Sequence, residues 1–235
     1  MMQPLKGDRL LAAWDRGAQQ SDLNRAVTLL AVASQDRSEE RLASLSIPER
    51  NLMLLDLHRI SFGDTLHGYL PCPSCGTRLE FVVPVSPLID RLEAARPRGN
   101  AVWETEGVQY SMRPADSHDL AAVARQSDSQ RARRLLLERC TTPPRLEGCE
   151  EVAVRKFTEL HEGAEVFLSL PCPACEQTNR LDLDVPRFLW AEVRHTALGL
   201  LREVHELASA YGWSESAILA MEDVRRAAYL EMGLS

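Results

Sequence analysis

The sequence contains two near-identical cysteine motifs, and they limit the folds open to this chain more than any other feature. The pattern Leu-Pro-Cys-Pro-x-Cys occurs at residues 70–75 and again at residues 170–175. In both copies a short extended arm precedes the motif, and a run of alternating apolar and polar residues, typical of a β-strand, follows it. Two thiolates on one tight turn form half of a tetrahedral metal site, so two such turns can complete one. The sequence therefore predicts that these distant segments meet at a single metal ion.

The predicted ligands are Cys72, Cys75, Cys172 and Cys175. Four protein ligands leave no coordination position open, so the metal is expected to be structural and not catalytic. Thiolate ligands at this spacing favour one zinc ion per chain, although an iron–sulfur cluster can use the same four sulfurs. A redox dithiol is a further alternative. Its reactive cysteine usually lies at a helix N-terminus, whereas strands are expected after both turns here.

The remaining reactive residues show no comparable pattern. Cys140 and Cys149 have no partner at ligand spacing, and we expect them to be small buried apolar residues with no chemical role. The six histidines form no H-E-x-x-H motif or similar pair, and the sequence contains no P-loop, dinucleotide-binding glycine motif or G-x-S-x-G motif. These observations favour a binding or assembly protein over an enzyme, with no small-molecule substrate.

Apolar periodicity and capping residues predict a mostly helical chain of the α+β class. A hairpin is expected over residues 101–113, because two alternating runs flank Glu106 and Gly107. The two C-P-x-C knuckles should form a zinc-ribbon-like central region of short strands. We divide the chain into an N-terminal helical region (1–63), a mixed region with both knuckles (64–185), and a long helix with a small helical tail (186–235). The helices are predicted at residues 22–34, 46–62, 117–123, 127–139, 151–161 and 186–212, followed by a short helix after Ser214 and another at 224–232.

Net charge and hydropathy limit the partners and the cellular compartment that we expect for this protein. The chain has 34 acidic and 27 basic residues, a net charge of −7, which argues against general binding to nucleic acid. The first residues lack the apolar stretch of a signal peptide, and the apolar runs are shorter than the roughly 20 residues of a membrane helix. We therefore expect a cytoplasmic protein with no membrane partner. In that reducing compartment, paired cysteines more often bind metal than form disulfides.

Several segments resemble one known family. They are GDRLLAAWDRG, LLDLHRISFGDTLHGYLPCPSCGTRLEF, RPADSHDLAAV with RRLLLERC, and FLWAEVRHTALGLLREVHELASAYGWSESAILAMEDVRRAAYL. Together they resemble the baseplate hub assembly chaperone family of T-even-type phages, in the branch found beside contractile tail-like injection systems. The resemblance extends over nearly the whole chain. It implies a non-enzymatic helper in building the hub and spike of a contractile baseplate, either as a chaperone or as a component of the assembled particle.

The C-terminal segment is the predicted contact surface for hub or spike proteins. It offers aromatic and aliphatic anchors of the kind that dominate interface energies, namely Tyr211, Trp213, Ile218, Leu219 and Tyr229. The alternative is that these residues pack onto the preceding long helix as ordinary core. Two other functions stay open at this stage: a zinc-ribbon adaptor that contacts nucleic acid, and a thiol redox protein.

Overall fold

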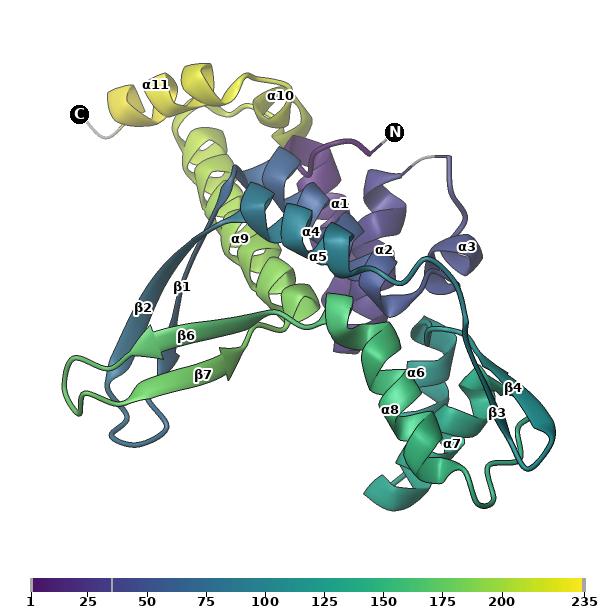
Figure 1. Cartoon of the computed structure of the whole chain (residues 1–235). Coiled ribbons are helices and arrows are strands. Elements are labelled where there is room, and N and C mark those ends of the chain that lie inside the picture. Colours follow the sequence, from purple (N-terminus) through teal and green to yellow (C-terminus); the bar gives the residue numbers. More distant parts are fainter. Residues whose placement is uncertain (1, 35, 234–235) are drawn as a thin grey trace.

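A computed structural model describes residues 2–34 and 36–233 of the chain. It confirms the predicted α+β class, with many helices, short antiparallel strands and one long helix near the C-terminus. Figure 1 shows a central group of helices from which two hairpins extend to one side, while a second lobe lies on the other side. Among the described residues, no helix is both long enough and apolar enough to cross a membrane.

The N-terminal part is a group of helices. Helix α4 begins with a capping box, in which the Ser46 hydroxyl accepts the backbone N–H of Glu49 and the Glu49 carboxylate accepts that of Ser46. Sequence analysis predicted α2 and α4 but not the other two, and α1 has no side-chain cap that would have marked its start. The helices are α1 (Gly7–Gly17), α2 (Asp22–Ala33), α3 (Glu39–Ala43) and α4 (Ile47–Phe62).

Two separate hairpins carry the cysteine motifs at their turns. Strand β1 (Thr65–Pro71) pairs with β2 (Arg78–Pro84), and β6 (Phe167–Pro171) pairs with β7 (Thr178–Asp182), both antiparallel. The predicted alternation is present in β2, where Leu79 and Phe81 are buried. Figure 1 shows the turn ends of both hairpins on the same side of the molecule.

A second lobe lies between the two hairpins in the sequence. The predicted hairpin is confirmed: Glu106 and Gly107 both have positive φ, 52° and 77°, as a tight two-residue turn requires. A short third strand extends this sheet in the order β3-β4-β5. The elements of the lobe are β3 (Ala101–Thr105), β4 (Val108–Met112), α6 (Ser117–Val123), α7 (Ser129–Cys140), β5 (Thr141–Thr142), α8 (Glu150–His161) and the short 3-10 helix η1 (Glu162–Ala164).

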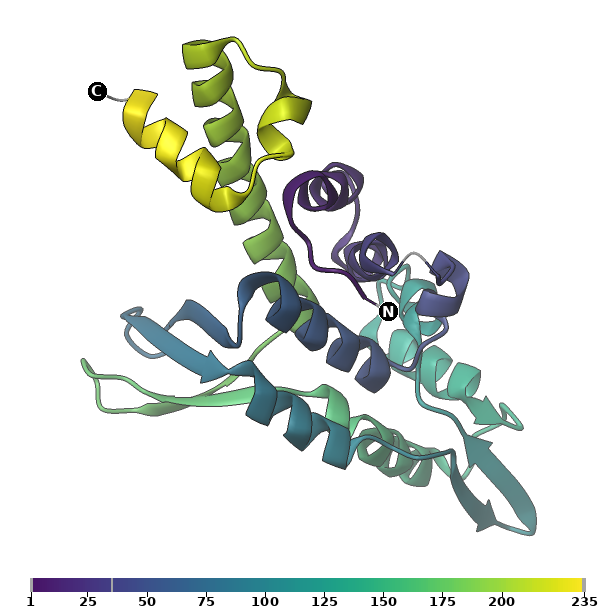
Figure 2. The same cartoon turned by 90° about the horizontal axis from the view of Figure 1, so that it is seen from above.

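Helix α9 (Val185–Tyr211) connects the central helices to the C-terminal tail. Its start is capped by Asp184, which accepts the N–H of Arg187, and it ends at Gly212, whose φ of 70° is left-handed. Helices α10 (Glu215–Leu219) and α11 (Asp223–Gly233) then fold back against the far end of α9. Figure 2 shows this tail beside α9, apart from the hairpins and the second lobe.

The buried residues form one large core and several smaller ones. The large core joins α1, α2, α4, α9 and both hairpins, together with α5 (Val85–Ala95), a helix not predicted from the sequence. Helix α5 follows β2 directly and has no side-chain cap; the prolines at positions 84 and 87 mark the boundary, a signal that the prediction did not use. The second lobe has its own core around Met112 and Leu146. The proposed division at residues 63 and 185 stays a prediction, although the large core contains residues from all three regions.

Candidate metal centre

Each knuckle is built by the same pair of backbone hydrogen bonds. In the first, the N–H of Cys72 donates to the carbonyl of Thr77 (2.8 Å), and the N–H of Gly76 donates to the carbonyl of Cys72 (2.9 Å). In the second, both equivalent bonds at Cys172 measure 2.9 Å. The two turns therefore have one geometry, as their shared motif predicted.

The residue after the second cysteine is left-handed in both turns. Gly76 has a φ of 73°, and Glu176, at the equivalent position, has a φ of 59°. Only glycine adopts this region without a steric penalty. Because Glu176 adopts it as well, the turn must be held by the rest of the hairpin and not by the preference of the residue itself.

The turns bring all four predicted cysteines together. Their sulfur atoms lie within 4.8 Å of one another. Two contacts between the sulfurs join the hairpins, Cys72 to Cys175 at 3.7 Å and Cys75 to Cys172 at 3.6 Å. A tetrahedral ion with metal–sulfur bonds of about 2.3 Å requires sulfur–sulfur edges of about 3.8 Å. The four thiols therefore fit one tetrahedral metal ion with little rearrangement.

The surroundings of the cluster are partly apolar and partly polar. Cys72 and Cys172 are both buried, whereas Cys75 is exposed. The side-chain amide of Asn179 donates to the sulfur of Cys72 at 3.5 Å, a contact from the opposite hairpin. Sequence analysis did not identify Asn179, because its only signal is a polar residue a few positions beyond the second motif. It would help to orient Cys72 once that sulfur carries charge.

The thiols differ in their readiness to ionise. Burial opposes ionisation of Cys72, but the backbone N–H groups of Cys75 and Ser74 and the neighbouring thiols lower its pKa to about 6. For Cys175 the N–H of Gln177 lowers the pKa, but burial and the hydrogen bonds to the other three sulfurs outweigh it and raise the pKa to about 12. By itself the cluster therefore supports ionisation of some thiols and not others. A bound cation would allow all four to be thiolates.

The other cysteines lie away from this cluster. Cys140 and Cys149 are both buried, as expected. Burial and the nearby Asp119 carboxylate raise the pKa of Cys140 to about 12, so its thiol is unreactive. Across residues 2–34 and 36–233, the four motif cysteines are the only group of three or more His, Cys, Asp or Glu side chains placed to share an ion.

The predicted partner anchors lie mostly against α9. Ile218 is fully buried with Val204 and Leu207 in a small core. Tyr211 stacks on Trp213 with ring centroids 4.5 Å apart, and Tyr229 contacts both rings edge-on. Trp213, Leu219 and Tyr229 are half-buried, and Tyr211 keeps 36% of its surface exposed. Ile218 thus contributes to packing within the tail, and a role of the others in binding a partner stays a prediction.

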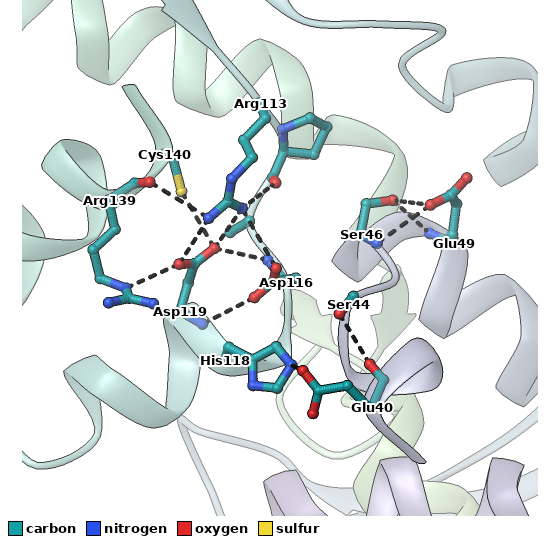
Figure 3. A network of polar contacts seen from close by, with 12 residues as sticks. Glu40, Ser44, Ser46, Glu49, Arg113, Asp116, His118, Asp119, Arg139 and Cys140 are labelled. Carbon is teal, nitrogen blue, oxygen red and sulfur yellow. Dashed lines mark hydrogen bonds and ion pairs between the residues drawn. The ribbon is translucent and has the colours of Figure 1, made fainter. Parts of the chain in front are cut away.

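Sequence analysis missed a buried charge network in the second lobe, shown in Figure 3. Asp119 is fully buried and accepts two hydrogen bonds from Arg113, at 2.6 and 3.0 Å, and one from Nε of Arg139 at 2.9 Å. It also accepts the N–H of Asp116 (3.1 Å) as part of the capping box of α6. Burial alone would raise the pKa of Asp119, but these donors lower it to about 2. The network joins the end of β4 to α6 and α7.

Comparison with known proteins finds no protein-family model that matches this chain, and no curated protein or solved structure that matches it. The interpretation of the cysteine cluster therefore depends on its own geometry.

Proposed function

We propose that this protein is a zinc-stabilised, non-enzymatic assembly factor for the baseplate hub of a contractile phage tail or phage-like injection system. The observation that carries the metal part is the convergence of four thiols, two from each hairpin, at tetrahedral spacing. The baseplate part is supported by the sequence resemblance described above. In this proposal the protein meets hub or spike proteins in the cytoplasm, either as a chaperone or as a component that stays in the particle.

Zinc is the metal that best fits the site. Four thiolates from two tight turns are the ligand set of structural zinc sites, and they leave no position for water or substrate. Structural zinc contributes about 10–16 kcal/mol of apparent binding free energy in small peptides, which is comparable to the stability of a whole domain. The ion would therefore hold the two hairpins together and would not take part in a reaction.

The pairing of Arg78 on the first hairpin is one argument for a protein partner over nucleic acid. Arg78 stacks on Tyr69, with its guanidinium 3.9 Å from the ring centroid, and lies 3.3 Å from the Glu80 carboxylate. An arginine that is already paired with a carboxylate contributes little attraction to a phosphate backbone. Together with the acidic net charge, this makes the zinc-ribbon adaptor for nucleic acid the weaker alternative.

Metal analysis of the purified chain, combined with thiol titration, tests the zinc part of the proposal. The expected result is about one zinc per chain, no iron, and no disulfide that a reductant can open. Iron with sulfide in place of zinc would identify an iron–sulfur protein. A metal-free chain with a reducible disulfide between motif cysteines would instead support thiol redox chemistry.

Co-expression with tagged hub and spike proteins tests the assembly part. We expect the chain to co-purify with at least one of them and Trp213→Ala to weaken this capture, because the C-terminal aromatic group is the predicted contact. Trp103→Ala is the matched control: Trp103 is also a half-buried tryptophan in a ring stack, with Tyr110 at 5.2 Å, but it lies in the second lobe. Equal capture by both variants would place the interface elsewhere. No capture by the wild-type chain would refute the baseplate role.

A further inference from the structure

The second lobe and the central helices have separate apolar cores, and little apolar contact joins them. The large core contains none of residues 101–161, and the core of the lobe takes in only Ile47 from the central helices. We call the contact between residues 101–161 and helices α2–α4 the seam. Two cavities flank it, one of about 930 Å³ beside α4 and α5 and one of about 300 Å³ between α2, α3 and α6. The seam is therefore narrow.

Polar groups contact each other across the seam. Figure 3 shows this region, with the cap of α4 on one side and the start of α6 on the other. The contacts are the Ile47 N–H to the Ala115 carbonyl (2.9 Å), Arg50 to the Ser117 hydroxyl (3.2 Å), and His118 to the Glu40 carboxylate (3.4 Å). When the interface between two folded units is small and polar, relative motion of the units is the default expectation.

Arg50 is a buried charge at the centre of the seam, with only 4% of its surface exposed. Its two terminal nitrogens donate to neutral oxygens of Ser117 and Asn51, at 3.2 Å each, and its Nε has no hydrogen-bond partner. Among the described residues, no carboxylate lies at ion-pair distance from it. Burial lowers the pKa of Arg50 to about 10, although the more distant Asp184 acts in the opposite direction. The closed seam thus holds a charge whose desolvation is poorly compensated.

Two segments connect the lobe to the rest of the chain, and both are fixed at their central ends. Residues 96–100 lie between α5 and β3, and Arg96 at their start pairs with Glu49 at 3.3 Å. Helix η1 lies between α8 and β6, and its Ala164 carbonyl accepts the side-chain amide of Asn51 at 3.2 Å. A body that is attached at two fixed points can rotate about the line that joins them.

We propose that residues 101–161 form a hinged body that swings away from the central helices about residues 96–100 and 162–164, and that the buried charge of Arg50 favours the open position. Opening hydrates the Arg50 guanidinium and widens the cavity of about 930 Å³ between the lobe and helices α4 and α5. This inference goes beyond the assembly role proposed above and does not depend on it.

Backbone hydrogen exchange of the full-length, zinc-loaded chain, measured by NMR, tests the opening. The N–H groups of Ile47 and Arg50 both belong to the first turn of α4, but Ile47 donates across the seam and Arg50 donates to the Ser46 carbonyl at 2.8 Å. Fraying of the turn would expose both amides, whereas opening of the seam exposes only Ile47. After correction for intrinsic rates, exchange at Ile47 should be at least about tenfold faster than at residue 50.

Substitution of Arg50 tests the role of its charge. Arg50→Met removes the charge and keeps a long side chain. It should slow exchange at Ile47 by about tenfold, because the closed seam then no longer buries a poorly compensated charge. Exchange at residue 50 should stay unchanged. Arg50→Lys is the matched control, since it retains a charge at the same position, and exchange at Ile47 should stay at least as fast as in the wild type.

A distance measurement tests the rotation without any change at Arg50. Spin labels on non-natural amino acids at Val102 in the lobe and Arg194 on α9, both exposed positions, leave the motif cysteines free to bind metal. The distance distribution of the otherwise unchanged chain should be broad or have two maxima. The control pair, Val102 with the exposed Arg155 of α8, lies within the lobe and should give one narrow maximum.

Three results would overturn the proposal. The first is a distribution between Val102 and Arg194 as narrow as that of the control pair, because the lobe would then be held rigidly. The second is equal exchange at Ile47 and residue 50 in the wild type, which would show fraying alone. The third is unchanged or faster exchange at Ile47 in Arg50→Met, because Arg50 would then not favour opening.

Discussion

The two hairpins that carry the cysteines and the second lobe between them both use short antiparallel strands, but different interactions stabilise them. The hairpins are two-stranded, and near their turns the buried cluster consists of little more than Cys72, Leu79 and Cys172. The second lobe adds a third strand and covers its sheet with helices, which creates a separate apolar core. Isolated two-stranded hairpins are marginal in water. The second lobe thus has an apolar core of its own, whereas the hairpin ends depend on the cysteine cluster, where the proposed ion would supply the missing stabilisation.

The two regions also differ in how the charge of their buried polar groups is balanced. In the second lobe the buried Asp119 carboxylate finds its counter-charges within the chain, on Arg113 and Arg139. At the hairpin ends the polar neighbours of the sulfurs are all neutral: other thiols, the Thr77 hydroxyl, the Asn179 amide and backbone N–H groups. The buried charge of the lobe is therefore balanced within the chain, whereas four thiolates at the hairpin ends would need the proposed cation to balance them.

Loss of one ligand should have the largest effect. Cys172→Ser is expected to release the metal and destabilise the hairpins by about 5 kcal/mol or more, since a structural zinc site requires all its ligands. Hydrogen exchange should become faster over residues 65–84 and 167–182 while residues 101–160 keep their protection. Cys140→Ala, which removes a buried thiol outside the cluster, should retain the metal. Equal loss of protection in hairpins and lobe would show that the two regions are not independent.

The second-largest loss of stability is expected when the Asp119 carboxylate of the second lobe is removed. Asp119→Ala is expected to cost about 3 kcal/mol, because it removes a buried carboxylate that accepts four N–H hydrogen bonds, while Arg113 keeps only one carboxylate contact, with Asp116 at 3.6 Å. The metal should stay bound, and faster hydrogen exchange should be confined to the lobe. Asp128→Asn is a suitable control: Asp128 is an exposed N-cap of α7, and asparagine caps equally well. A change below 1 kcal/mol for Asp119→Ala would mean that the apolar core alone stabilises the lobe.

Acid should affect the lobe through the same residue. The pKa of Asp119 is about 2 in the folded protein and 3.8 for an unperturbed aspartate. A lowered folded pKa stabilises the fold above about pH 4, and this contribution is lost as the pH falls towards 2. Its size is on the order of 2 kcal/mol. Denaturation of wild type and Asp119→Asn at pH 7 and pH 3 measures it, since the difference between the two proteins should shrink in acid. A difference that is constant with pH would contradict this assignment.

The smallest effects should distinguish the two knuckles from each other. Gly76→Ala should destabilise the first by about 1 kcal/mol, because alanine is strained at a positive φ. Glu176→Gly should stabilise the second by up to about 1 kcal/mol for the same reason. Chemical denaturation with metal bound measures both. Opposite signs at equivalent positions are the expected result, and equal signs would show that the side chain of Glu176 matters more than its backbone.

Features that depend on residues close together in the sequence could be predicted from it. The four cysteines, the capped starts of α2, α4 and α9, and the turn at Glu106 and Gly107 all have short-range signals. Helices α1 and α5 lack a side-chain cap and were missed. The Asp119 network could not be predicted either, because it depends on residues 113 and 139 lying beside residue 119 in space.

The separation of the two knuckles has a consequence for protein synthesis. Cys75 and Cys172 lie 97 residues apart in the sequence. At about 5–20 residues per second, a ribosome needs roughly 5–20 s to pass from one to the other. During that interval the nascent chain presents a lone pair of thiols that can bind an ion only incompletely. The whole second lobe is synthesised in the meantime, so the proposed four-thiolate site could close only after translation of the first 175 residues is complete.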